Sequence, residues 1–486
     1  MRTRLLPVAC VVGSALAWLA ILAVDLRITD EPGMLGGRWN VLRAVMTWWV
    51  LLVPAVLLLR RAPRRLGVAL MLAGLVGLQI AGMQRPSSVM SDDAYRYAWE
   101  GRVQAAGTDP YRYAPTAPEL SGFRDPWLWP DAAGCAAIER DPGCTRINYK
   151  DERTIYPPVA EAYFVVVHAL PGPDRDGKFQ LYGGLVGLAL VALLARELAA
   201  RGRSPAEAAW YAWSPMAGLE VASDAHVDVL AAALTVAALA FARARRPGWT
   251  GGMIGAAIAV KLYPALLLPA LLRTGRVPRL LLAAVAVVVV SYVPHVAAVG
   301  FDVVGFLPRY LSIEGYSEGT RFLLVRLVPG PPKLYAAVIL AALAWLAYVG
   351  RISAVELVGG AFLVATPVQT WYALVLVAVA VLDARPQWLA VAAAAYPLYN
   401  VGPPEEKQVV GAVWYGIAAA IVLGPAFLRR TMRTGPVERS GPTFREWFDA
   451  SPLGERLTTR ARNRTLAPRR ASAGAVPGPP SDRPPG

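Results

Sequence analysis

Blocks of about 20 apolar residues, separated by short clusters of arginine, make up most of this chain. Early examples are residues 5–24, 41–59 and 66–83. A block of that length crosses the hydrocarbon core of a bilayer as one α-helix, and inside lipid only helices and closed barrels satisfy the backbone. Charged residues make up 17% of the chain, against roughly a quarter in soluble domains. The sequence therefore predicts an all-α, polytopic membrane protein.

The arginine clusters indicate how the helices are oriented. The net charge is +15, and the arginines gather in short loops such as residues 60–65. That pattern is typical of cytoplasmic loops, so nucleic acid is not an expected partner. The chain is expected in the plasma membrane, with its N-terminus and C-terminal tail cytoplasmic and residue 84 on the outer face.

Four regions follow from this topology. Residues 1–83 are predicted to be N-terminal transmembrane helices, and residues 84–178 a large extracytoplasmic loop with interfacial helices, one of them in 156–173. Residues 179–428 are predicted to be a transmembrane core, which brings the expected number of transmembrane or half-membrane helices to roughly ten to thirteen. Residues 429–486 are rich in proline, arginine and serine, which predicts a disordered, basic, cytoplasmic tail.

Two features of the loop and the core need separate interpretation. Cys135 and Cys144 lie close together in the outer loop, where a disulfide and two free thiols both remain open. In the core, Lys261 and Pro264 lie in the middle of one apolar segment. They predict a helix broken at mid-membrane, which is tolerated only where it is buried or lines a cavity. A lysine there needs an anion, and a phosphate at the interface would satisfy it.

Two adjacent aspartates open the outer loop. If a helix starts at Asp92 or Asp93, one acid caps it, and Asp93, Arg96, Tyr97 and Glu100 share one face. Two interpretations stay open. One is a capped interfacial helix with salt bridges, including one from Asp92 to Arg96. The other is a general base beside cations that hold an anionic substrate.

Aromatic residues accompany these charges. Tyr111, Tyr113 and Tyr156 lie in the outer loop, and they fit either an aromatic belt at headgroup depth or a wall against which a sugar stacks. The segment TPVQTWY, residues 366–372, adds polar and aromatic groups at another junction of short helices.

A fourth polar group lies at a predicted helix corner. It contains Glu220, Asp224, His226 and Asp228. Two acids and one histidine form a set that can ligate a metal, and a hydrogen-bonded helix cap is the simpler alternative. We favour a substrate-binding role, so no metal is assigned and no cofactor is expected to be required.

Several motifs occur together in one order: YRYAWEGRVQAAGTDPYRYAP, IYPPVAEAYF, SPMAGLEVASDAHVD, KLYP and TPVQTWY. In that order the chain resembles the bacterial polyprenyl-phosphate-sugar-dependent glycosyltransferases of the glycosyltransferase-C superfamily. It is most similar to actinobacterial membrane mannosyltransferases, over about residues 84–428. The resemblance implies a cavity at the outer leaflet, a lipid-phosphate sugar donor and transfer with inversion to a glycan or glycolipid hydroxyl.

The resemblance also implies roles for individual residues. An acid in the first outer loop acts as the base, which falls on Asp93 first and Asp92 second. The residues that would meet the donor phosphate are Arg96, Arg102, Lys261 and Arg321. The residues that would contact substrate are Tyr111, Tyr156, Glu220, His226, Asp228, Gln369, Trp371 and Tyr372. Val227 stands where relatives often carry an asparagine, so a contact through that amide is not expected.

Two other functions share these features. A transporter or flippase of a lipid-linked sugar would also use broken helices and a lysine at the midplane, but such proteins usually contain internal repeats and this sequence has none that we detect. A polymerase or ligase of lipid-linked polymers would share the fold and differ in the size of its donor.

Overall fold

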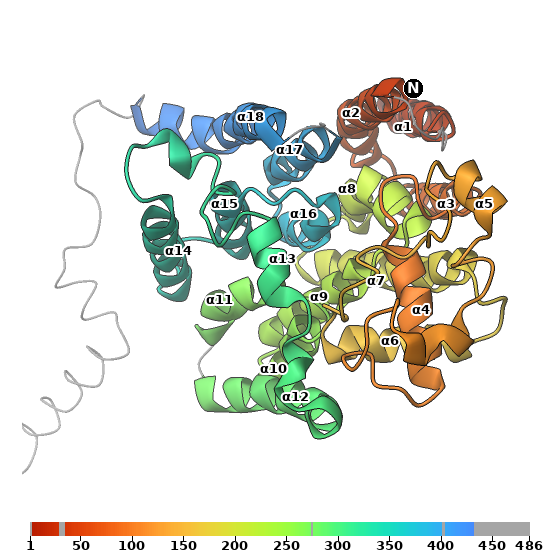
Figure 1. Cartoon of the computed structure of the whole chain (residues 1–486). Helices are drawn as coiled ribbons and strands as arrows, with labels where there is room; N and C mark the ends of the chain where they lie inside the picture. Colours follow the sequence, from red (N-terminus) through yellow and green to blue (C-terminus); the bar gives the residue numbers. More distant parts are fainter. Residues whose placement is uncertain (1, 29–34, 274–275, 401–403, 432–486) are drawn as a thin grey trace, which may run out of the picture. The chain divides into compact units, whose positions relative to one another are not determined.

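A computed structural model describes residues 2–28, 35–273, 276–400 and 404–431. Contacts divide the chain into two compact units, residues 1–425 and 426–486, and the site lies in the first. Most of the predicted tail, 429–486, is outside the described residues. The described ranges contain helices and turns and no strand, which confirms the predicted helical class (Figure 1).

Six of the described helices are long and apolar enough to cross a membrane. They are Pro7–Asp25, Trp39–Leu59, Arg64–Met83, Asp176–Ala200, Val277–Ile313 and Glu406–Gly424. Five shorter apolar segments of 10–17 residues accompany them. Many apolar side chains of the six long helices are exposed on the surface of the protein, for example Leu282 and Val290. A polytopic membrane protein is therefore supported, and the larger count of ten to thirteen stays a prediction.

The N-terminal helices pack onto the core through tryptophans. They are α1 (Arg2–Asp25), α2 (Leu35–Leu59) and α3 (Arg64–Met83). The Trp48 indole N–H on α2 donates to the carbonyl of Trp213, 2.7 Å away. The Trp213 indole in turn donates to the carbonyl of Met71 on α3, at 3.0 Å. A buried indole needs such a partner, so these bonds fix how the helices meet.

Residues 84–178, predicted to lie outside the membrane and called the outer loop from here on, fold around short helices. They are α4 (Asp93–Ala105), η1 (Pro118–Phe123), α5 (Ala132–Ala137) and α6 (Pro158–Ala169). Figure 1 shows α4 against α6, and a Cβ added at Gly101 would lie 2.5 Å from the carbonyl oxygen of Phe164. At 12 residues, or about 18 Å, α6 is too short to span the bilayer. A disulfide joins Cys135 to Cys144, which settles the alternative left open by the sequence.

The polar corner predicted at residues 220–228 is a widened turn. The surrounding elements are α7 (Asp176–Ala200), η2 (Pro205–Ala208), α8 (Ala209–Ala212), the π-helix η3 (Met216–Ser223) and α9 (Asp228–Arg243). Ala225, between η3 and α9, has a left-handed φ of 56°, which an alanine adopts only under constraint. Segments of π-helix occur frequently at functional sites.

The predicted break near Lys261 is present. The chain forms α10 (Pro247–Ile258), leaves the helix, and resumes as η4 (Tyr263–Leu267) and α11 (Leu268–Leu272). The carbonyl of Ala259, at the break, accepts the backbone N–H groups of Val159 and Ala160, 2.9 and 3.4 Å away. Those two groups belong to the first turn of α6, so the outer loop caps the interrupted helix.

The C-terminal half completes the described fold. Its elements are α12 (Val277–Val299), η5 (Gly300–Val304), α13 (Leu307–Ile313), η6 (Val325–Leu327), α14 (Pro332–Tyr348), α15 (Ala354–Ala365), η7 (Thr370–Tyr372), α16 (Ala373–Leu382), η8 (Pro386–Trp388), α17 (Leu389–Asn400) and α18 (Pro404–Thr431). Close approach of α12 to α10 depends on glycine, since a Cβ at Gly251 would lie 2.1 Å from the carbonyl oxygen of Leu280.

Candidate active site

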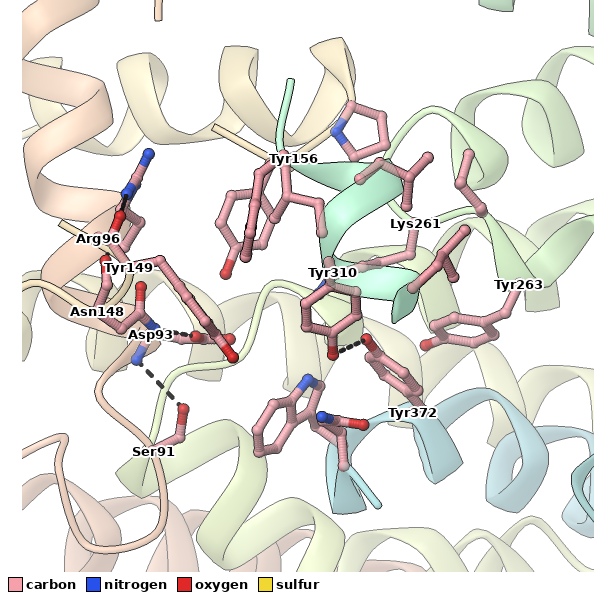
Figure 2. Close-up of a pocket in the computed structure, with 18 of the residues that line it drawn as sticks. Ser91, Asp93, Arg96, Asn148, Tyr149, Tyr156, Lys261, Tyr263, Tyr310 and Tyr372 are labelled. Carbon is pink, nitrogen blue, oxygen red and sulfur yellow. Dashed lines mark hydrogen bonds between the residues drawn. The ribbon is translucent and has the colours of Figure 1, made fainter. Parts of the chain in front are cut away.

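A cavity of about 390 Å³ lies where the outer loop meets the broken helix. Its walls come from the start of α4, residues 148–157, the break at 261–263, residues 306–316 and residues 369–372. Figure 2 shows Asp93, Arg96 and Asn148 at one end of the cavity. Lys261 lies at the other end. The cavity thus brings together segments that are far apart in the sequence.

Both aspartates line this cavity, and one amide holds them. Asn148 Nδ2 donates to Asp93 Oδ1 at 2.6 Å and to Asp92 Oδ1 at 3.1 Å. The Asp92 side chain occupies the N-cap position of α4 but makes no capping hydrogen bond, because its oxygens are turned to Asn148 and Arg140. The expected Asp92–Arg96 pair is therefore replaced by an Asp92–Arg140 pair, with 3.5 Å between Oδ2 and the guanidinium.

The two carboxyls have different surroundings. The pKa of Asp92 is raised by removal from water and then by the charge of Asp93, against the hydrogen bond from Asn148. Asp93 is 9% exposed. Its Oδ2 accepts from the Tyr97 hydroxyl at 3.4 Å and lies 3.7 Å from His226 Nδ1. Asn148 therefore holds Oδ1 of Asp93, while Oδ2 makes only long contacts. A carboxylate oxygen with only long contacts can take up a proton from a substrate.

Arg96 lines the cavity but is already saturated. Its guanidinium pairs with Glu100 one turn along α4, as the shared helical face predicts. Its remaining N–H groups donate to three backbone carbonyls, those of Asn148, Tyr149 and Glu152, at 2.9–3.3 Å. Arg96 therefore fixes the segment that carries Asn148.

Lys261 is a half-buried cation at the opposite end of the cavity. Its Nζ lies 3.3 Å from Asp228 Oδ2 and 4.9 and 5.5 Å from the ring centres of Tyr156 and Tyr372. The hydroxyl of Tyr263 also donates to Asp228, at 3.0 Å. One carboxylate and two aromatic faces therefore hold the ammonium group at the wall of the cavity, where it can meet an anion.

Aromatic side chains form much of the wall between these ends. Tyr156, Trp371, Tyr372 and Gln369, all predicted substrate contacts, line the cavity. The Gln369 amide donates to Glu314 Oε1 at 2.9 Å. The Tyr310 and Tyr372 hydroxyl oxygens lie 3.1 Å apart, a contact drawn in Figure 2. Such faces suit the apolar side of a sugar ring.

The remaining predicted residues lie elsewhere. Glu220, His226 and Asp228 are fully buried, with His226 stacked on Trp371 at 3.9 Å between ring centres. Tyr111 is buried, and its hydroxyl donates to the carbonyl of Tyr156, at 2.5 Å. His226, Asp228 and Tyr111 thus contact lining residues from behind, and Glu220 lies behind them against His226.

Two of the predicted phosphate ligands are outside the cavity. Arg102 pairs with Asp125 and Asp174, at 3.2 and 2.9 Å. Arg321 pairs with Glu314 at 3.1 Å. The structure therefore gives both arginines acidic partners of their own, and of the four cations singled out in the sequence only Arg96 and Lys261 line the cavity.

Asn148, Tyr149 and Tyr310 also line the cavity and were not singled out in the sequence. Asn148 and Tyr149 precede the cluster of charges in KDER, and nothing local distinguishes their amide and hydroxyl from ordinary loop residues. Burial raises the pKa of Tyr149, so its hydroxyl stays protonated at neutral pH. The fold makes Asn148 and Tyr149 functional candidates by placing them beside Asp93, and Tyr310 by placing it on the wall of the same cavity.

Several further spaces share residues with the cavity, and two of them differ in polarity. A polar cavity of about 650 Å³ shares Asp92, Asn148 and Tyr149 with it and extends over Lys150 and Arg309. On the other side, an apolar groove of about 490 Å³ shares Leu262 and Tyr263. Its other lining residues are Ala265, Leu266, Pro269, Leu340, Ala344, Leu357 and Ala361. The central cavity therefore lies between a polar space and an apolar one.

The fold and this site define a helical membrane protein with a polar and aromatic cavity that adjoins an apolar groove. Residues 154–395 match the model of Glycosyltransferase family 87, GT87, and this match supports a membrane glycosyltransferase. The matched range includes the break, the 220–228 corner and residues 369–372, while Asp92 and Asp93 precede it. No curated protein and no solved structure gives a significant match to the chain.

Proposed function

We propose that the protein transfers a sugar from a polyprenyl-phosphate donor to a hydroxyl of a lipid-linked glycan or another acceptor on the outer face of the plasma membrane. The observation that carries the proposal is the sequence of three adjoining spaces. An apolar groove, a cation-bearing cavity and a polar cavity follow one another. Asp92 lines both the central and the polar cavity, and Asp93 lines the central one beside it. The lipid chain of a donor would occupy the groove, its phosphate and sugar the central cavity, and a hydrophilic acceptor the polar cavity.

The donor would enter from the groove. Its polyprenyl chain would lie along residues such as Leu266 and Leu340, which bury apolar surface as the hydrophobic effect favours. Its phosphate would then reach Lys261 at the junction of groove and cavity. Phosphate at that point would compete with Asp228 for the ammonium group, 3.3 Å from the carboxylate. Lys261 would stabilise the charge that grows on the phosphate as it leaves.

The acceptor would enter from the polar cavity. Its hydroxyl would come to Asp93, and Asp93 Oδ2 would take the proton as the hydroxyl oxygen forms a bond to the anomeric carbon. The bond from that carbon to the phosphate oxygen breaks in the same displacement, and polyprenyl phosphate departs with the electron pair. Attack opposite the leaving group inverts the anomeric centre. No cofactor takes part in this step.

Asp93 is our choice of base because its second oxygen has only long contacts and faces the interior. Asp92 is held by Asn148 and Arg140 on the side of the polar cavity, where it fits a contact with the acceptor. Mannose is the proposed sugar on the resemblance to actinobacterial mannosyltransferases. The aromatic wall at Tyr156 and Tyr372 supports a pyranose without specifying which one.

The test is transfer by the purified protein in nanodiscs. Polyprenyl-phosphate-mannose is supplied with candidate glycolipid acceptors, and the product and its anomeric configuration are read by mass spectrometry and NMR. Transfer with inversion supports the proposal. Passage of the intact donor across a vesicle membrane without transfer would instead identify a transporter or flippase.

The predicted orientation has its own test. An impermeant maleimide added outside intact cells should label Cys135 or Cys144 after reduction of their disulfide, and Cys144 is the more exposed of the two. Labelling only in inverted vesicles would place the outer loop, and the proposed site, on the cytoplasmic side.

A further inference from the structure

Three ligand-type side chains converge behind the cavity wall. Glu220 lies in η3, Asp224 follows its end, and His226 comes next after the left-handed Ala225. All three side chains are fully buried. The widened helix and the unusual backbone at Ala225 together turn these groups towards one another, and strain of this kind is found mainly at sites with a specific task.

Each carboxylate is anchored through one oxygen and leaves the other without a partner. The Tyr396 hydroxyl donates to Glu220 Oε1 at 2.7 Å, and the Met90 N–H donates to Asp224 Oδ1 at 3.3 Å. Glu220 Oε2, Asp224 Oδ2 and both ring nitrogens of His226 are buried and accept or donate no hydrogen bond. Within the described part of the chain, no lysine or arginine forms an ion pair with either acid.

Ligand atoms of the three residues are spaced for a common ion. One ligand atom from each residue lies within 4.8 Å of the other two. Three such atoms fit in a circle of radius about 2.8 Å, close to the roughly 2.0–2.6 Å of bonds from nitrogen and oxygen to divalent cations. A shift of a few tenths of an ångström in each side chain would complete coordination.

We infer that Glu220, Asp224 and His226 bind one divalent metal ion of the manganese-to-zinc series. One imidazole and two carboxylates form a ligand set that suits these ions. The alternative is an ion pair between protonated His226 and Glu220, whose Nε2 and Oε2 lie 3.4 Å apart. That pair would leave Asp224 Oδ2 buried and unpartnered, whereas a divalent ion satisfies both acids.

The ion would also act on the candidate base through the histidine. With His226 Nε2 on the metal, the ring carries its proton on Nδ1, which lies 3.7 Å from Asp93 Oδ2. A ligating histidine typically donates its other N–H to a carboxylate in this way. The stacked Trp371 keeps the ring in that orientation. The metal would thus position Asp93, while its binding does not depend on sugar transfer.

The test is the metal content of the whole protein. Wild type, Asp224→Asn and His226→Gln are purified with added Mn²⁺ or Zn²⁺, desalted, and measured by inductively coupled plasma mass spectrometry. His168→Gln is the control, because His168 pairs with Asp174 away from the cluster. We expect about one equivalent of one metal in wild type and control, and at least a tenfold loss in both cluster variants.

A second measurement uses wild type alone, in case a variant does not fold. Chelator should lower its thermal midpoint, and the same metal should restore it, because an ion that binds only the folded state stabilises it. Wild type with no bound metal and no response to chelator would overturn the inference. Equal metal content in wild type and both cluster variants would overturn it as well. Neither result requires a sugar donor, so each is distinct from failure of the proposed transfer.

Discussion

Replacing Asp93 by asparagine should remove the proton acceptor while keeping the geometry. The oxygen of the new amide can still accept from Asn148 Nδ2, which is 2.6 Å from Asp93 Oδ1 in the wild type. Its NH₂ group would then face the Tyr97 hydroxyl, 3.4 Å from the present Oδ2. The pocket is therefore preserved, and what changes is that an amide cannot take a proton.

The expected loss follows from that change. A positioned general base contributes about 10²–10⁴-fold, or about 2.7–5.5 kcal/mol of transition-state stabilisation at 1.36 kcal/mol per decade. We expect kcat for transfer to fall by that factor in Asp93→Asn with little change in the KM of the donor, because the phosphate is bound at Lys261. Asp92→Asn, whose carboxyl is turned to Arg140, should lose less than about tenfold.

The assay is transfer of radiolabelled sugar at saturating donor, with dispersity checked by size-exclusion chromatography. Glu119→Gln is the matched control, since this exposed acid on η1 lines none of the three spaces. Asp93→Asn with at least a third of wild-type kcat would refute the role of Asp93. A hundredfold loss of kcat in Asp92→Asn alone would identify Asp92 as the base. Unchanged kcat in both variants would show that the reaction does not take place in this cavity.

Three further predictions follow from the site and the packing. Removal from water and the charge of Asp93 raise the pKa of Asp92 above the ordinary 3.8, so a contact between its carboxylate and the acceptor should be lost at a higher pH than for a free aspartate; the rise in acceptor KM on the acid side should therefore be present in the wild type and absent in Asp92→Asn. Lys261→Met should raise the KM of the donor at least tenfold and lower kcat, because the phosphate loses the cation at the cavity wall. Gly251→Ala should lower the free energy of unfolding by about 1–3 kcal/mol through its clash with Leu280, measured as a lower thermal midpoint.

Each of these has a contrary outcome. The same acid-side rise of acceptor KM in Asp92→Asn as in the wild type would show that the Asp92 carboxylate does not contact the acceptor. Unchanged donor KM in Lys261→Met would place the phosphate elsewhere. For the packing test, Gly252→Ala is the control, because a Cβ there meets nothing within 4 Å and alanine favours a helix. Equal midpoints for the two glycine variants would contradict the proposed close approach of α10 and α12.

Local hydropathy was enough to predict most helices. The apolar blocks at 5–24, 41–59 and 66–83 correspond to α1, α2 and α3, because bilayer thickness dictates the length of a spanning helix. The break at Lys261 was also predictable, since a charged residue and a proline in one apolar segment cannot both remain in a straight, lipid-facing helix.

The partners of the charged residues were not predictable in this way. Arg102 appeared suited to a phosphate, but Asp174, 72 residues further on, binds it. Asn148 was overlooked because its role depends on Asp93, 55 residues away. Pairings over such distances are set by how α4, α6 and the intervening loop fold together, and no periodicity in the sequence encodes them.

The hydrogen bonds from α6 to the carbonyl of Ala259 couple the outer loop to the membrane core. Ala259 ends α10, two residues before Lys261, and α6 begins two residues after Tyr156. This backbone junction therefore sets the distance between the Lys261 ammonium group and the ring of Tyr156, which lie on different segments. Any opening of the cavity to admit donor or release polyprenyl phosphate would have to carry α6 along or detach it, so substrate entry and the folding of the outer loop are mechanically linked.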